Sequence, residues 1–273
     1  MDRRVLTVDT KGIADFARIS DAIRAAVNGD IIALRMGLFE EKVFINKEIE
    51  LTTDRDVEPG EVIVTSGIIV TAYGVVVRNL HIQQQVDVRS GSATFVQCDL
   101  SQGADGIRVL TGASAKLTNC KIHQVVTNGD GVYVQEGGKA ELEGCDISDC
   151  RVNGVHVKGG DLLMRKCNIS GCDFGVYFRK SGHGAVEDCS FDRVKSFAVY
   201  ITGGSDPVIC RNSIKNADIH GIMVAQLGGG VLRDNTVEGS VRILRGCTPT
   251  LHVNNVTGRV DNETVQPGAL LAA

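Results

Sequence analysis

The sequence lacks the features that mark several classes of protein. It has no tryptophan and only four prolines among its 273 residues, but it has 32 glycines. This composition suits thin β layers better than a thick globular core. No run of 18 apolar residues is present, which argues against a transmembrane helix. The net charge is −4, without the basic excess that nucleic-acid binding usually requires. We therefore expect neither a membrane nor a nucleic acid as partner.

The N-terminus also lacks the apolar core of a secretory signal, because residues 1–7 read Met-Asp-Arg-Arg-Val-Leu-Thr. Nine cysteines are present without a CxxC pair. The one CxxH, from Cys120 to His123, ends beside a predicted buried strand residue and is interpreted as structural. We expect a cytoplasmic protein with reduced thiols, no metal and no cofactor.

One six-residue phrase recurs every 18 to 25 residues. It begins with an apolar residue and two positions of variable residue type. The fourth position is usually Cys or Asn, the fifth is variable and the sixth is apolar. Residues 117–122, Leu-Thr-Asn-Cys-Lys-Ile, are one of nine copies in a common register. The fourth position forms the series Leu80, Cys98, Cys120, Cys145, Cys167, Cys189, Asn212, Asn235 and Asn254. A period of this length predicts a solenoid.

A second phrase alternates apolar and polar residues after a glycine, as in residues 130–134, Asp-Gly-Val-Tyr-Val. The alternation predicts a strand with one buried face. The glycine suggests a corner whose backbone angle other residues resist. Leucine-rich repeats would need several leucines per repeat, whereas Val and Ile are used here. We therefore predict an all-β fold: a single-stranded right-handed parallel β-helix of about ten coils, with Cys and Asn side chains stacked from coil to coil.

Residues 1–60 differ from the repeats and predict an amphipathic helix that caps the open end of the stack. Asn28-Gly29 is its expected C-cap. The residues at helical spacing are Phe16, Ile19, Ala22, Ile23, Ala26 and Val27. Strands are predicted near residues 31–35, 42–46, 49–52 and 62–65. The expected organisation is one continuous domain, with the cap and first coils in residues 1–60, repeats in 61–260 and a tail in 261–273.

The repeats resemble those of the pectin-lyase-like β-helix superfamily over nearly the whole chain. Residues 15–41 resemble the opening of pectin methylesterases. The resemblance implies the fold but leaves the function open, because unrelated activities share this scaffold. The methylesterase, pectate-lyase and alginate-epimerase catalytic motifs are absent. Residues 182–184 (Gly-His-Gly) and 193–195 (Arg-Val-Lys) match parts of the polygalacturonase pattern, but its Asp-Asp element is missing, so we interpret the match as coincidence.

The middle residue of the strand phrase should point outward, so that stacked coils turn it into a row on the surface. The next outward position contributes Lys158 and Arg179. Aromatic faces can stack on sugars or peptides, and Arg and Lys can hold carboxylates. Alternatively, Tyr is simply a favourable residue on an exposed sheet. The predicted ligand-binding residues are Arg108, Tyr133, His156, Lys158, Tyr177, Arg179 and Tyr200.

Asp105 and Asp130 hold equivalent positions on adjacent coils. They could act as an acid/base pair or share a cation. Asp-Gly is also ordinary turn chemistry, and we favour this interpretation. If the protein is catalytic, the candidate residues are Asp105, Asp130 and His156.

Two functional hypotheses follow. The favoured one is a non-catalytic recognition or scaffold domain that binds an extended oligosaccharide, peptide or protein along its outward strand face, similar to intracellular β-helix modules. The alternative is a polysaccharide lyase, hydrolase or epimerase acting on uronic-acid-type sugars, with Tyr133 and Arg179 assisting the three candidate catalytic residues. The missing catalytic motifs favour the first. The oligomeric state stays open.

Overall fold

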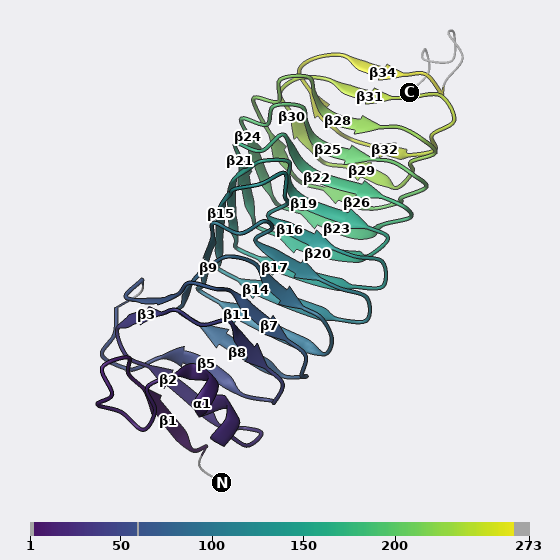
Figure 1. The fold of residues 1–273 in the computed structure, drawn as a ribbon. Coiled ribbons are helices and arrows are strands. Elements are labelled where there is room, and N and C mark those ends of the chain that lie inside the picture. The colour runs from purple at the N-terminus through teal and green to yellow at the C-terminus, as the bar shows by residue number, and fades with distance from the viewer. Residues whose placement is uncertain (1–2, 59, 265–273) are drawn as a thin grey trace.

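The computed structural model describes residues 3–58 and 60–264. The chain winds into a stack of coils, and each complete coil adds one strand to each of three parallel sheets (Figure 1). Sheet A has twelve strands, and sheets B and C have eleven each. The stack therefore has about twelve turns instead of the expected ten, because the first strands of residues 1–60 already join the sheets.

From β2 on, the strands follow in the order A, B, C along the chain, whereas β1 and β2 both belong to sheet A. Sheet A contains β1 (Val5–Val8), β2 (Ile31–Leu34), β5 (Glu50–Thr53), β8 (Val75–Arg78), β11 (Ser92–Val96), β14 (Ser114–Thr118), β17 (Lys139–Glu143), β20 (Asp161–Arg165), β23 (His183–Glu187), β26 (Val208–Cys210), β29 (Val231–Arg233) and β32 (Thr250–His252). Sheet B contains β3 (Gly37–Phe39), β6 (Val62–Val64), β9 (His81–Gln83), β12 (Asp99–Ser101), β15 (Lys121–Val125), β18 (Asp146–Cys150), β21 (Asn168–Ser170), β24 (Ser190–Asp192), β27 (Ser213–Ile214), β30 (Thr236–Val237) and β33 (Asn255–Val256). Sheet C contains β4 (Val43–Ile45), β7 (Ile68–Val70), β10 (Val86–Val88), β13 (Ile107–Val109), β16 (Val132–Val134), β19 (Asn153–Lys158), β22 (Phe174–Arg179), β25 (Phe197–Ile201), β28 (His220–Val224), β31 (Val241–Ile243) and β34 (Val260–Asn262).

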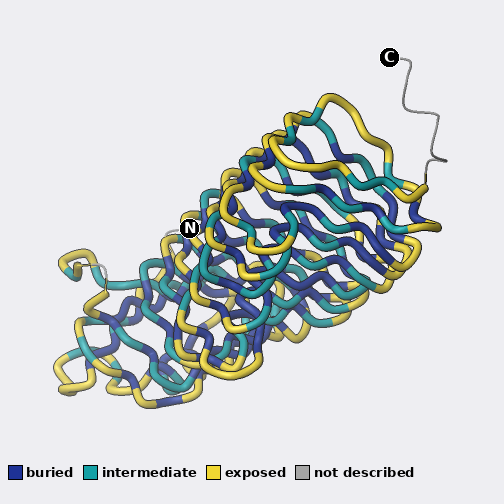
Figure 2. Tube along the Cα trace, turned by 90° about the horizontal axis from the view of Figure 1, so that it is seen from above, coloured by how far each residue is buried: buried dark blue, intermediate teal, exposed yellow. Residues whose placement is uncertain are grey.

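The interior of the stack is a continuous apolar column, drawn in dark blue in Figure 2. Equivalent inward side chains are direct register partners, as Leu100, Ile122 and Ile147 are in sheet B. The predicted Cys and Asn row is confirmed as stacked, and all of its members are buried except the half-buried Asn254. Cys145 donates its backbone N–H to Cys167 Sγ at 3.4 Å, and Asn212 Nδ2 donates to Asn235 Oδ1 at 3.0 Å. All nine cysteines are buried and free.

Corners between sheets A and B have left-handed backbone angles. The residue before each position of the Cys and Asn row, from Asn79 to Asp234, has φ between +51° and +63°. Five of these eight residues are Asn, Asp or Gly, which tolerate this region best. The sequence analysis treated this position as variable, whereas it is the turn that redirects each coil.

The glycine of the strand phrase has a different role from the one predicted. Gly131 and Gly154 do not have positive φ. A Cβ built on Gly131 would lie 2.6 Å from the carbonyl oxygen of Gly154, and one on Gly154 would lie 2.8 Å from that of Gly175. Glycine is required here because adjacent coils approach closely.

The capping helix α1 spans Ile19–Ala25 and buries Ile19, Ala22 and Ile23 against the first coils. It is shorter than predicted. Ala26 is already extended and forms the C-cap, so the expected Asn28-Gly29 cap is wrong. Instead, Lys47 Nζ donates to three carbonyls at the helix C-terminal end. No helix in the described ranges is long and apolar enough to span a bilayer.

Candidate functional site

Sheet C brings the predicted row together on one face. Asp87, Arg108, Tyr133, His156 and Tyr177 are successive Cα partners. Tyr200 continues the row. The flanking strand residues are inward, apolar and fully buried, which fixes the alternate residues outward. We call the set Arg108, Tyr133, His156, Tyr177 and Tyr200 the outward row.

His156 lies in the outward row but is buried, with 7% of its surface exposed, so the predicted exposure to solvent is wrong for this residue. Its Nδ1 pairs with Asp130 Oδ2 at 2.7 Å, and Arg179 Nε donates to its Nε2 at 2.8 Å. Arginine can only donate, so Nε2 must accept and Nδ1 must carry the proton. The contacts therefore hold His156 as one neutral tautomer.

The rings of His156, Tyr177 and Tyr200 stack on one another, whereas Tyr133 meets His156 edge-to-face. The Tyr177 ring lies 5.2 Å from His156 and 4.8 Å from Tyr200, both at interplanar angles of 13°. These neighbours lie on the preceding and following coils, so both faces of Tyr177 are covered. Our expectation that this ring offers a face to a sugar is wrong. It presents its edge instead, and its hydroxyl group accepts from Thr202 Oγ1 at 3.5 Å.

A second aromatic group, not predicted from the sequence, lies beside the outward row. Phe174 stacks on Tyr177 at 6.0 Å and Tyr200 at 5.9 Å, and Phe197 stacks on His220 at 5.7 Å. Burial lowers the pKa of His220, with a further contribution from Arg242. Phe174 and Phe197 begin their copies of the strand phrase, at the position that Asp105 and Asp130 hold on earlier coils. That substitution pattern was the available signal.

The three cationic side chains of the predicted site differ in how far other residues of the protein already bind them. Arg108 bonds to Asp87 at 2.9 Å. Burial alone would raise the pKa of Asp87, but hydrogen bonds from Arg108 and Gln85 more than offset it and hold that pKa below its ordinary value. Arg179 is held by His156, and its guanidinium carbon lies 5.9 Å from the centre of the Tyr177 ring. Lys158 is half-buried and extends the same face.

Asp105 and Asp130 are adjacent, but they serve the backbone and His156. Asp105 Oδ1 accepts the Asp130 backbone N–H at 2.8 Å, and burial raises the pKa of Asp105. Asp130 accepts Asn153 Nδ2 at 2.5 Å through its other oxygen. Asn153 Oδ1 is buried without a partner among the described residues. This geometry supports the turn interpretation over an acid/base pair.

The other candidate metal-binding and catalytic side chains do not form a common site. Within residues 3–58 and 60–264, no three His, Cys, Asp or Glu side chains are arranged to hold a metal ion. His123 pairs with Asp99 at 2.8 Å across sheet B. His183 lies on sheet A, whereas Arg193 and Lys195 follow sheet B, so the partial polygalacturonase pattern does not assemble.

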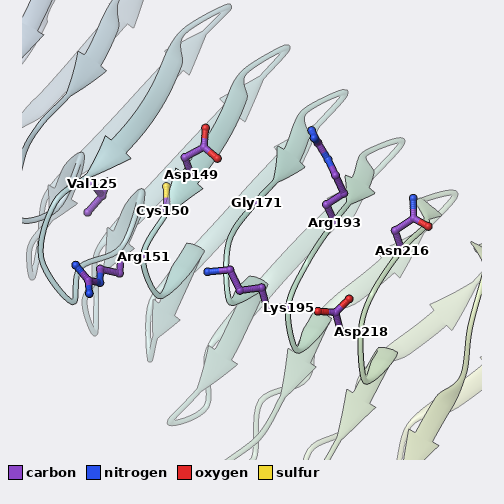
Figure 3. A pocket seen from close by; sticks show the side chains of 9 residues that line it. All are labelled: Val125, Asp149, Cys150, Arg151, Gly171, Arg193, Lys195, Asn216 and Asp218. Atoms are coloured by element: carbon purple, nitrogen blue, oxygen red, sulfur yellow. The ribbon is translucent and has the colours of Figure 1, made fainter.

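A groove of about 630 Å³ lies at the corner between sheets B and C, beside the first residues of the sheet C strands (Figure 3). Its lining is mainly polar and charged, and it includes Arg151, Arg193, Lys195 and Asp218. This groove was not predicted from the sequence.

Comparisons with known proteins agree with this fold. The family model "Right handed beta helix region" matches residues 105–257. An alginate lyase from Paenibacillus sp. str. FPU-7 superposes with a TM-score of 0.71 at 13% identity, covering 93% of this chain and 99% of the lyase. Pectate lyase Pel9A gives 0.57 at 13% identity, covering 98% and 82%. The A-module of the Azotobacter vinelandii mannuronan C-5 epimerase AlgE6 gives 0.57 at 12% identity, covering 89% of each chain. No curated protein sequence matches significantly.

Proposed function

Since this chain belongs to the right-handed β-helix family, we propose that it is a non-catalytic recognition domain that binds an extended, carboxylate-bearing oligosaccharide along the outward face of sheet C. Its fold is shared with polysaccharide lyases and epimerases, and such a fold presents one long face of repeated strands. The fold alone does not specify the ligand, so the proposal depends on the residues of the outward row.

The observation that carries the proposal is the alignment of Tyr133, Tyr177 and Tyr200 on one face of sheet C, with buried His156 between the first two. Lys158 and Arg179 border these tyrosines on neighbouring coils. Tyrosine hydroxyls can donate to and accept from sugar hydroxyls. Lys158 and Arg179 can pair with carboxylates. The ring stack and the His156 contacts fix these groups before binding, which lowers the entropy cost of association.

The same contacts argue against catalysis. A general base needs a free lone pair within reach of a substrate proton. Both nitrogens of His156 and both oxygens of Asp130 are already engaged within the protein. These contacts keep a binding surface rigid, which favours binding. The same contacts occupy the atoms that an acid/base site would need for proton transfer.

Titration calorimetry with oligosaccharides tests the proposal. We expect binding of a uronic-acid oligomer and weaker binding of a neutral oligomer of equal length. Lys158→Gln should weaken binding of the acidic oligomer about fivefold to tenfold, corresponding to roughly 1 kcal/mol. Lys139→Gln removes the same charge on sheet A and is the matched control. Equal losses from both variants would refute the assignment to sheet C, and a peptide that binds while both sugars fail would favour the peptide alternative.

One observation favours the enzyme alternative. The Asp130–His156 contact at 2.7 Å is the arrangement by which a carboxylate orients an imidazole base. Release of Arg179 by a substrate carboxylate would expose Nε2 for proton abstraction. Sustained formation of unsaturated or reducing ends from uronate polymers, lost in His156→Gln, would support this alternative over binding alone.

We further propose a reducing, cytoplasmic setting. Nine buried free thiols support it, because disulfides are characteristic of oxidising compartments.

A further inference from the structure

The groove at the corner between sheets B and C has two parallel rows of side chains (Figure 3). The first, the turn row, contains the left-handed corner residues of four successive coils: Asp149, Gly171, Arg193 and Asn216. The second, the charge row, lies two residues later on the same coils: Arg151, Asp173, Lys195 and Asp218. All of these line the groove except Asp173, which is paired with Lys195. Neither row belongs to the proposed oligosaccharide face.

The charge row alternates in sign from coil to coil. Its central members are paired with each other, Lys195 Nζ with Asp173 Oδ1 at 2.9 Å. Its outer members, Arg151 and Asp218, form no ion pair within the described residues. Both outer side chains line the groove. The row therefore presents one free positive charge at one end and one free negative charge at the other.

This alternation restricts the occupant. A uniformly charged polymer would meet a like charge on every second coil, and such contacts are repulsive. The occupant must instead carry alternating charges near the coil spacing of about 4.8 Å. A second copy of this charge row, running in the opposite direction, carries the opposite charge at each of the four positions.

We propose that this corner binds a second copy of the chain in a two-fold dimer with the two solenoid axes antiparallel. A two-fold axis between the coils of Asp173 and Lys195 places Arg151 opposite Asp218 of the second copy, and Asp173 opposite Lys195 of the second copy. Each contact occurs twice, as in any isologous interface. The charge complementarity is complete along all four coils.

The turn row fits the same symmetry. Gly171 is the one member of this row without a side chain, and a Cβ there would lie 2.6 Å from Asp149 Oδ1. The two-fold axis places Gly171, with the Asp149 carboxylate beside it, opposite the exposed Arg193 of the second copy. It also places Asp149 opposite Asn216, which can donate its amide. The Asp149 carboxylate of one copy thus lies near both a guanidinium and an amide donor of the other.

Apolar residues beside the charge row are also brought opposite each other by the two-fold axis. Ile219, directly after the charge row, is 54% exposed. Its counterpart under the two-fold axis is Val152, which holds the equivalent position beside Arg151 and is half-buried. Pairing Ile219 with Val152 of the second copy covers an apolar side chain at each end of the interface. Such burial adds a favourable contribution that salt does not screen.

The surface spans about 14 Å along the axis, so the interface is small and we expect a weak dimer, with a Kd on the order of tens to hundreds of micromolar. Its ion pairs should be screened by salt. We expect the Kd to rise about tenfold between about 50 mM and about 500 mM NaCl.

Analytical ultracentrifugation of charge-reversal variants tests the proposal. Arg151→Glu alone and Asp218→Lys alone each place like charges opposite each other twice, so each variant should be monomeric under conditions where the wild type associates. An equimolar mixture of the two should associate again, because each then supplies the complement of the other. The double variant carrying both changes should also dimerise. Circular dichroism checks that all variants keep the fold.

Three results would overturn the proposal: a monomeric wild type at millimolar concentration in low salt, single variants that associate as the wild type does, or a mixture that stays monomeric. Association that survives both single variants would assign the dimer to another surface. Restored association in the mixture cannot arise from a general change in net charge.

Discussion

His156 Nδ1 and Asp130 Oδ2 lie 2.7 Å apart across adjacent coils. Asp130 precedes strand β16, so this contact joins the start of a sheet C strand to the outward row. Arg179 in turn donates to the opposite nitrogen of His156. A single carboxylate thereby fixes the orientation of an imidazole, and the imidazole holds a guanidinium in place. The order of the proposed binding face depends on this chain of contacts.

We predict that Asp130→Asn destabilises the protein by about 1–3 kcal/mol, because a buried charge-assisted acceptor of two hydrogen bonds is lost. Urea unfolding measures the change. Asp105→Asn is the matched control on the preceding coil. It keeps the Oδ1 atom that accepts the Asp130 N–H, so its effect should stay within about 0.5 kcal/mol. Equal destabilisation by both variants would show that the contact between Asp130 and His156 adds nothing to the free energy of unfolding.

Asp87 gives a prediction for pH dependence. Its folded pKa lies below the ordinary value of 3.8, so its stabilising contribution is present above that value and is lost as pH falls through the lowered pKa. Asp87→Asn should therefore cost roughly 2 kcal/mol at pH 7, and the gap to wild type should narrow below about pH 4. Unfolding free energies measured from pH 7 to pH 2 check this. A gap that does not narrow would contradict the assigned role.

The cap of helix α1 can be tested through Lys47, whose ammonium donates to the carbonyls of Ile23, Arg24 and Ala26 at 2.6–2.9 Å. Lys47→Met keeps the aliphatic stem but leaves these helix-end carbonyls without their donor. We expect a loss of about 1–2 kcal/mol and earlier melting. Lys42→Met, at an exposed position nearby, should change little. Indistinguishable melting curves would show that the helix needs no such clamp.

The cysteine row predicts nine reactive thiols after denaturation, whether or not reductant is present. Stacked coils hold equivalent side chains near the coil spacing of about 4.8 Å, longer than the Cβ separation of roughly 3.8 Å that a disulfide prefers. Thiol titration in denaturant provides the count. A deficit of two or more thiols without reductant would disprove the reduced row.

The sequence was sufficient to predict the fold because the inward row repeats one chemical requirement on every coil. Cys120, Cys145 and Asn212 each occupy the same buried corner, so their spacing alone indicates the solenoid. The same logic placed Tyr133 and Tyr177 on one face, since strand alternation decides which side chains point outward.

Other features depend on contacts between coils that spacing does not specify. Whether His156 is exposed depends on the ring orientations of its neighbours and on the reach of Arg179. The rings of Tyr177 and Tyr200 stack because both adopt the same orientation. The groove is lined by side chains from several coils that only the fold aligns.

The central claim, that the outward face of sheet C binds an extended acidic oligosaccharide, is tested most directly by titrating the isotope-labelled protein with a uronic-acid oligomer and following its backbone amide resonances. The account predicts saturable shifts concentrated in β16, β19, β22 and β25, including Tyr133, Lys158 and Arg179. Shifts confined to sheet A or to the groove at Gly171, or no shifts with acidic, neutral or peptide ligands, would contradict it.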